Sequence, residues 1–430
     1  MTDADRDLGQ DLCRFVDAGP SPYHAVAEMA RRLEAAGFSE LDEREHWALA
    51  PGDRRFVVRD GGSVAAFVVG SAAPSDAGFR MVGAHTDSPT FAVRPLPDVR
   101  RGGFALVGVE PYGGVLAHTW FDRDLTVAGR LAVRTASGIT TALVRLPGAP
   151  LRIPNLAIHL FRELREEGFK PDPQQHAVPV WGFDSTGALL DALAGHAGVD
   201  PGDVLGHDLV LADTQPAALG GADDAFVLAP RLDNLASCHA ALHALTAAGP
   251  GRATAVLVAN NHEEIGSASA EGAQGSFLED VLRRVVSATE GDDGQRFAMA
   301  CARSRLVSSD MAHAVHPNYS DRHEPGHTPR LGGGPVLKSN ANQSYATDAV
   351  GTAHFRAACA EAGVAVQHFA TRADLPCGST IGPLTATRLG VATVDVGNPL
   401  LSMHSVREQA AAADIAPMAA ALRAHLSADE

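Results

Sequence analysis

The sequence predicts an α/β fold, with a mostly parallel central sheet that is flanked by helices and interrupted by a β-rich insertion. Apolar runs followed by helical patterns occur at ATAVLVA, SRLVSS, VAVQHFA and VATVDVG, which is typical of parallel sheets covered on both faces. Between about residues 93 and 229, alternating segments separated by glycine-rich turns indicate antiparallel strands instead. This change of pattern predicts a discrete domain at 93–229, inserted between 1–92 and 230–430; a third layer of one domain is the alternative.

The expected elements follow in chain order. A helical stretch over about 6–36 precedes two strands, within SVAAFVVG and FRMVGAHTDSP. In the insertion, DLTVAGRLAVRT and ITTALVRL predict antiparallel strands. The pattern NLAIHLFRELREEG predicts a helix that begins at Asn155 as N-cap and ends at Gly168. RLGGGP, at 330–335, predicts a loop, because it lacks the GxGxxG spacing and no helical pattern begins on it.

Composition excludes several classes of protein. The 430 residues suggest two or three domains, and an apolar content of 45% supports a large core. No run of 18 apolar residues predicts a transmembrane helix, and the acidic start MTDADRDLGQDLCRF lacks the layout of a signal peptide, so a cytoplasmic location is expected. A net charge of −16 disfavours nucleic acid and membrane partners. The five cysteines have no paired spacing, which argues against disulfides and CxxC metal sites.

Residues that can bind metals lie at or just after the C-terminal ends of apolar runs. They are His85, Asp233, Glu263, Glu264, Asp310 and His404. At the carboxyl edge of an open α/β sheet, successive strands bring their ends to one crevice. A single His or Asp there is more often a helix cap or a satisfied polar group, but five such positions together, with Glu263 and Glu264 counted as one, favour a metal site. Histidines with carboxylates suit two zinc ions about 3.5–4 Å apart, bridged by one carboxylate, rather than a cysteine-rich structural zinc.

The segment NNHEEIGS places two carboxylates, Glu263 and Glu264, side by side. It lacks the second histidine of the HExxH motif. Neighbouring side chains of an extended segment point in opposite directions, so one Glu can bind metal while the other, bent back by a turn at 265–266, acts as general base. Stabilisation of a helix dipole by both is the alternative. His85 and Asp87 are two residues apart and point the same way, so Asp87 can fix the tautomer of His85.

Nine blocks of the chain together resemble bacterial members of the aspartyl aminopeptidase family of zinc metallopeptidases. They are GAHTDSP, YGGVLAHTWFDRDL, RIPNLAIHL, RLDN, NNHEEIGS, SSDMAHAVHPNY, GPVLKSNANQSYATDA, PCGSTIGP and MHSVRE, in family order from about residue 20 to 410. The resemblance implies two zinc ions per subunit, Glu263 as general base, Asp87 as the support of His85, and the metal ligands His85, Asp233 (bridging), Glu264, Asp310 and His404. It also implies a cis peptide at Asp233–Asn234, and a catalytic domain interrupted by a lid and dimerisation domain.

The activity that follows is removal of the N-terminal residue from peptides. Two zinc ions polarise the scissile carbonyl and activate a water, whose proton Glu263 takes and passes to the leaving amine. Lys338 matches the family's substrate-pocket lysine, which implies a preference for N-terminal Asp or Glu. A solvated surface lysine is the alternative. Ser344 stands where the family commonly has a basic residue, so the pocket is less cationic.

The resemblance further implies a homo-oligomer, a dodecamer built from dimers, in which His159 of RIPNLAIHL reaches the active site of a neighbouring subunit. Substrate contact by His159 is favoured over a direct metal contact; by pattern alone, a core or interface histidine beside Leu156 and Leu160 is as consistent. Three other functions stay open: a broader aminopeptidase, a metal-dependent deacylase or carboxypeptidase, and a non-catalytic binding protein. Glu263 argues against the last, and the KSNANQSY block against the deacylase.

Overall fold

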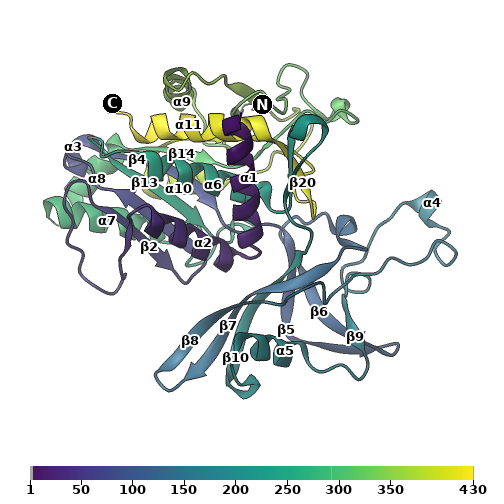
Figure 1. Ribbon diagram of the computed structural model, residues 1–430. Helices are drawn as coiled ribbons and strands as arrows, with labels where there is room; N and C mark the ends of the chain where they lie inside the picture. Colours follow the sequence, from purple (N-terminus) through teal and green to yellow (C-terminus); the bar gives the residue numbers. More distant parts are fainter. Residues whose placement is uncertain (1–2, 292, 430) are drawn as a thin grey trace.

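The computed structural model describes residues 3–291 and 293–429 and contains helices and three sheets, which makes it a mixed α/β fold (Figure 1). The largest sheet has nine strands in the order β1-β2-β3-β13-β4-β14-β18-β16-β17. Its central strands β13, β4, β14 and β18 run parallel to one another. Its bounds are β1 Ser39–Glu40, β2 Arg54–Arg59, β3 Ser63–Val68, β13 Thr254–Asn260, β4 Phe79–His85, β14 Arg305–Ser309, β18 Ala392–Gly397, β16 Val336–Ser339 and β17 Gln367–Ala370.

The strands near both edges of this sheet are of mixed direction. The pairs β1–β2 and β16–β17 are parallel, whereas β2–β3, β3–β13 and β16–β18 are antiparallel. Helices cover both faces. One face packs against α1 Asp3–Ala18, α2 Pro22–Ala35, α6 Leu232–Ala247, α9 Ala349–Glu361 and α11 Ile415–Leu426. The other packs mainly against α7 Phe277–Glu290 and α8 Gly294–Arg303, with α3 Pro74–Ala77 and α10 Ile381–Leu389 beside them.

The expected antiparallel region forms a second sheet, which lies below the central sheet in Figure 1. Its order is β8-β7-β10-β5-β6-β9, and every neighbouring pair is antiparallel. Helix α5 (Leu189–Ala197) contributes Leu189 and Leu193 to its separate apolar core. The strands are β5 Thr90–Arg101, β6 Phe104–Tyr112, β7 Leu125–Thr135, β8 Gly138–Arg145, β9 Val180–Phe183 and β10 Val204–Asp213.

A third sheet joins the end of the inserted region to the C-terminal part of the chain. Its strands are β11 Ala218–Gly220, β12 Phe226–Ala229, β20 Glu408–Ala411, β19 Pro399–Leu401 and β15 Ala312–His313, in that order. Because β12 pairs with β20, residues 218–229 lie in a sheet with C-terminal strands rather than in the six-stranded sheet.

Two predicted helices differ from the structure. The stretch 6–36 is two helices, because Ser21 caps the second one and Pro22 occupies its first turn. The helix expected over 155–168 is wrong except for its end, where the single turn α4 (Leu164–Glu167) stops at Gly168. Asn155 caps no helix; its backbone and side-chain NH groups donate to the carboxylate of Asp122. An isolated short helix is unstable in water, and here Leu156, Ile158 and Leu160 are exposed, so burial of an apolar face does not stabilise a helix.

Three further observations concern the described part of the chain. RLGGGP is a loop, as expected. All five cysteines are free thiols. Within residues 3–291 and 293–429, none of the helices combines the length and apolarity that a membrane crossing requires. The first two residues of the acidic N-terminal stretch lie outside the described residues.

Candidate active site

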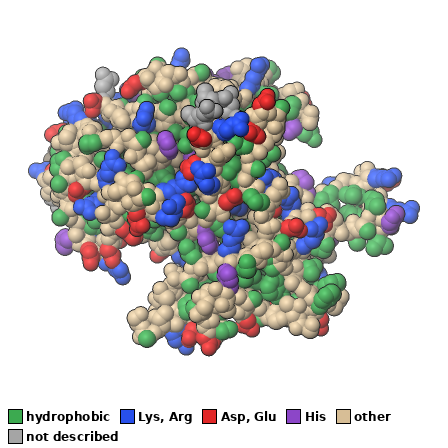
Figure 2. Space-filling model, viewed as in Figure 1, with side chains coloured by type: hydrophobic (Ala, Val, Ile, Leu, Met, Phe, Trp, Pro, Cys, Tyr) green, Lys and Arg blue, Asp and Glu red, His purple; other side chains and the backbone are tan. Residues whose placement is uncertain are grey.

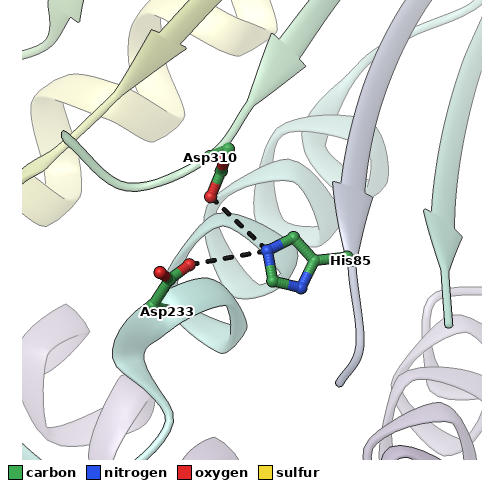
Figure 3. A group of neighbouring side chains, drawn as sticks. All are labelled: His85, Asp233 and Asp310. Carbon is green, nitrogen blue, oxygen red and sulfur yellow. Dashed lines mark ion pairs between the residues drawn. The ribbon is translucent and has the colours of Figure 1, made fainter. Parts of the chain in front are cut away.

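The central strands bring the candidate ligands to one edge of the sheet. His85 is the last residue of β4, and Asp310 directly follows β14. Glu263 and Glu264 follow β13 in a single 3-10 turn, and Asp233 lies where α6 begins after β12. Figure 3 shows the carboxylates of Asp233 and Asp310 pointing toward the ring of His85. The expectation that separate strand ends meet at one place therefore holds for these side chains.

Two adjacent clusters of side chains share Asp233, and a third group of possible ligands combines His85 with Glu263 and Glu264. In the first, Nε2 of His85 lies 3.5 Å from Asp233 Oδ1 and 3.4 Å from Asp310 Oδ1. In the second, Nε2 of His404 lies 3.4 Å from Asp233 Oδ2 and 3.5 Å from Glu264 Oε1. Each oxygen of the Asp233 carboxylate thus faces a different histidine, which is the arrangement that a bridging ligand requires.

These donors fit divalent cations with nitrogen and oxygen ligands. Zinc bonds of about 2.0–2.2 Å place tetrahedral ligand atoms about 3.3–3.6 Å apart, which agrees with both clusters. Among the described residues, Asp233 Oδ1 is buried without a hydrogen-bond donor, and such an oxygen is costly to bury unless a cation meets it. Nδ1 of His85 lies 3.1 Å from the backbone carbonyl of Asp87, and Nδ1 of His404 lies 3.1 Å from that of Gly114. Because a carbonyl can only accept, each Nδ1 must donate, which leaves each Nε2 free as a ligand.

The electrostatics of the site also call for positive charge. Burial raises the pKa of the Glu263 carboxyl to about 8, and the negative charges of Asp310 and Asp233 add to the rise. Burial and Asp233 likewise raise the pKa of Glu264 well above its ordinary value. Burial opposes charge on His85, yet the carboxylates around its ring raise its pKa well above the usual value. Carboxylates crowded in this way are stabilised as anions when cations lie among them.

Asp87 links His85 to the turn that carries the two glutamates. Its fully buried carboxylate accepts hydrogen bonds from the backbone N–H groups of Glu263 and Glu264, each at 3.1 Å. Its Oδ1 lies 3.4 Å from His85 Nδ1, farther than its own backbone carbonyl, which accepts from that nitrogen at 3.1 Å. Asp87 therefore orients His85 chiefly through its backbone, and its side chain holds the glutamate turn. The bond Asp233–Asn234 is a cis peptide, as the resemblance implied.

Comparison with known proteins identifies the family. The model of the family "Aminopeptidase I zinc metalloprotease (M18)" matches residues 15–426. The chain belongs to the M18 family of zinc aminopeptidases. It is 46% identical over 431 residues to the probable M18 family aminopeptidase 2 of Pseudomonas aeruginosa, with 99% of each chain covered.

Solved structures agree with this membership. In the cryo-EM structure of the Ape4 and Nbr1 complex, one chain is 37% identical to this one and superposes with a TM-score of 0.95, covering 99% of this chain and 86% of its own. The S. cerevesiae mApe1 dodecamer contains a chain that is 28% identical, with a TM-score of 0.86 and coverage of 98% and 97%. The fold and the zinc aminopeptidase class of this M18 member are thereby shown.

Glu408 is a residue of the M18 site that the sequence analysis did not single out. It is buried and accepts hydrogen bonds from the backbone N–H groups of Asp233, at 3.0 Å, and His404, at 2.7 Å. It thus holds together the backbones of two candidate ligands that are far apart in the sequence. Its position in the MHSVRE block was the available signal, but no spacing rule marks it as a partner of Asp233.

Lys338 of this M18 chain is not a solvated lysine, so that alternative is wrong. Its side chain on β16 is 2% exposed, and Nζ lies 3.4 Å from Asp310 Oδ2 and donates to the carbonyl of Met311 at 3.2 Å. The ammonium also lies 5.1 Å from the ring centre of Tyr345. Lys338 is therefore a buried cation beside a candidate metal ligand. Ser344 lies partly buried in the loop that precedes Tyr345.

His159 lies apart from both clusters. It belongs to the projecting segment, residues 154–163, which precedes α4 on the arm that extends away from the central sheet in Figure 1. The segment exposes His159 and three large apolar side chains: Leu156 at 55%, Ile158 at 43% and Leu160 at 74%. Hydrophobic side chains gather on this arm in Figure 2. The interpretation of His159 as a histidine of this chain's own core is wrong, because the residue is exposed.

Proposed function

We propose that this M18 aminopeptidase holds two zinc ions per subunit and removes N-terminal Asp or Glu from peptides. The observation that carries the proposal is the carboxylate of Asp233, whose oxygens face His85 and His404 separately. One ion would be held by His85, Asp233 and Asp310, and the other by His404, Asp233 and Glu264. Zinc in these positions would supply a Lewis acid for the scissile carbonyl and would lower the pKa of a bound water.

Glu263 is assigned as the general base. It lies in a group with His85 and Glu264, but its Oε2 is 3.9 Å from His85 Nε2, farther than the assigned ligands at 3.4–3.5 Å, and we assign it to proton transfer instead. Its carboxylate accepts a proton from the attacking water and delivers it to the nitrogen of the leaving amine. Asp87 keeps this carboxylate in place, because it binds the backbone N–H of Glu263. A protein that only binds peptide has no use for such a base.

The preference for an acidic first residue is assigned to Lys338. Two zinc ions and the carboxylates of Asp233, Glu264, Asp310 and Glu263 sum to nearly zero charge, so the cluster offers no surplus attraction to an acidic side chain. An acidic side chain that leaves water needs a cationic partner. The buried ammonium of Lys338, 3.4 Å from Asp310, lies beside the centre and suits a single carboxylate. Without a second basic group at Ser344, the preference is moderate.

The inserted region is assigned to assembly. We assign residues 1–92 and 230–430 to the catalytic domain, and 93–229 to a lid and dimerisation domain. The exposed apolar side chains of the projecting segment suit a protein interface, and a solved relative is a dodecamer. In such an assembly, His159 reaches the substrate in the active site of a neighbouring copy. We place the activity in the cytoplasm, with peptides and further copies of the chain as partners.

Three measurements test the proposal. Metal analysis of the purified protein should find two zinc ions per subunit. Peptides with a free N-terminal amine should be cleaved at the first bond, whereas N-acetylated copies of the same peptides should not. Rates should be higher for peptides that begin with Asp or Glu than with Leu or Lys. Equal rates for all four would favour a broader aminopeptidase, and cleavage of the acetylated copies would favour a deacylase or another peptidase class.

A further inference from the structure

A segment from the six-stranded sheet lies directly against the candidate metal centre. This strap, residues 112–116 with the sequence YGGVL, begins with the last residue of β6. The carbonyl of Gly114 accepts a hydrogen bond from Nδ1 of His404 at 3.1 Å, and the backbone N–H of Leu116 donates to the carbonyl of His404 at 3.0 Å. The hydroxyl of Tyr112 donates to Asp87 Oδ2 at 2.7 Å. The strap therefore contacts Asp87, which supports the cluster of His85, and His404, which belongs to the other cluster.

The glycines of the strap allow this close approach. Gly113 has a φ of 69°, and a Cβ atom there would lie 3.0 Å from Cβ of Glu264. A Cβ atom on Gly114 would lie 3.1 Å from Nδ1 of His404. A larger residue at either position would push against a candidate ligand, and at Gly113 it would also adopt a strained backbone. The two glycines thus bring the strap backbone into contact with the side chains of Glu264 and His404.

Tyr112 completes the hydrogen bonding of Asp87. Asp87 Oδ1 accepts from the N–H of Glu263, and Oδ2 accepts from the N–H of Glu264 and from the Tyr112 hydroxyl. Because Asp87 is fully buried, water does not reach it to replace a lost donor. The hydroxyl bond is the shortest of the three, as expected for an O–H donor to a carboxylate. Removing the hydroxyl leaves the carboxylate with the two N–H groups of the glutamate turn and the longer 3.4 Å contact to His85 Nδ1.

We propose that Tyr112 is a positioning residue for the zinc centre and for the general base. Its hydroxyl fixes the carboxylate of Asp87, and that carboxylate fixes the turn that carries Glu263 and Glu264. From the same strap, Gly114 fixes the ring of His404 with Nε2 toward Asp233. The six-stranded sheet therefore sets zinc affinity and the place of the base, beyond any role in covering the site. This inference rests on the zinc centre of the proposed function.

The test is Tyr112→Phe, which removes one oxygen and keeps the ring. Zinc affinity is measured by competition with a chelator, independently of activity, and kcat and KM are measured at saturating zinc. We expect zinc affinity and kcat each to fall about 10-fold, the lower end of the cost of losing a direct partner of a metal ligand, because Tyr112 acts through Asp87, with little change in KM. The matched control is Tyr23→Phe, since Tyr23 is also a buried tyrosine, and its hydroxyl interacts with Asp208 and not with Asp87. The control should keep wild-type values.

A double variant separates positioning from general loosening. If Tyr112 acts through Asp87, then adding Tyr112→Phe to Asp87→Asn should lower zinc affinity and kcat no further than Asp87→Asn alone. Additive losses, or a Tyr112→Phe protein with wild-type zinc affinity and kcat, would overturn the inference. A wild-type protein that binds no zinc at the clusters would instead overturn the proposed function, so the two failures are distinguishable.

Discussion

The adjacent glutamates allow a sharp test, because a single oxygen-to-nitrogen exchange should lower activity at both positions but remove zinc at only one of them. Glu263→Gln keeps the size of the side chain but cannot take a proton. General bases contribute about 10²–10⁴-fold to rate, so kcat should fall by that factor, or about 2.7–5.5 kcal/mol of barrier. Zinc content should stay at the wild-type level, since Oε2 of Glu263 lies 3.9 Å from His85 Nε2, beyond the ligand spacing.

Glu264→Gln should lose zinc as well as activity. Its Oε1 lies 3.5 Å from His404 Nε2 and is one of three assigned donors around the second ion. The assay is metal analysis after gel filtration, performed beside kcat on a peptide with an N-terminal Asp. Glu290→Gln is the control, because its carboxylate binds Ser75 and belongs to neither cluster.

The outcome that refutes the assignment is specific. If Glu263→Gln loses zinc while Glu264→Gln retains it, the two roles are reversed. If both variants keep zinc and full kcat, the clusters are not the catalytic centre at all. Restoring either variant with excess zinc distinguishes weakened binding from a lost proton acceptor, because added metal rescues only the first.

The remaining predictions concern specificity, assembly and pH. Lys338→Met should cost peptides with an N-terminal Asp about 2–4 kcal/mol of transition-state stabilisation, measured by kcat/KM. Peptides with an N-terminal Leu should lose less, and the loss common to both arises because Lys338 also contacts Asp310. Equal losses for the two peptides would contradict the acidic pocket. Leu160→Asp should shift the protein to smaller species in light scattering without lowering its thermal stability, because the side chain is 74% exposed; a wild type that is already an active monomer would contradict this. Hydrogen bonds from His239 and then Arg32 hold the pKa of Asp11 below its ordinary 3.8, so Asp11 adds stability above pH 3.8 that is lost as the pH falls. The difference in unfolding free energy between wild type and Asp11→Asn, measured by urea titration, should therefore shrink as the pH falls from 6 to 3. A constant difference would show that protonation of Asp11 does not change the stability that its hydrogen bonds provide.

The metal cluster could be predicted because a local pattern carries it. His85 and Asp310 each stand at the end of a short, mostly apolar and buried run, and parallel strands must bring such ends to one edge. The strands themselves were predictable for the same reason, since strands buried on both faces are mostly apolar. The sharing of Asp233 by two histidines was implied by family resemblance and not by spacing, and it depends on the backbone turn at the start of α6.

The partners of these residues were not predictable from local pattern. Glu408 meets Asp233 through a hydrogen bond that spans 175 positions, and Tyr112 meets Asp87 across the boundary between two sheets. No periodicity connects such pairs. The helix prediction for 155–168 was wrong for a different reason. The helical spacing of its apolar residues indicates a face that must be buried, but that face is exposed in a single chain. Local periodicity does not specify which surface covers an apolar face.

The shared carboxylate of Asp233 also bears on when the enzyme first becomes able to cut. Its two oxygens face His85 and His404, which are roughly 320 residues apart in the chain. At about 5–20 residues per second, a ribosome needs roughly 16–64 s to travel from one to the other. Until the later histidine emerges, the second cluster lacks its only imidazole, and the nascent chain has no complete centre. If these histidines hold the two ions as proposed, the order of the sequence delays completion of the catalytic centre until most of the chain has been synthesised.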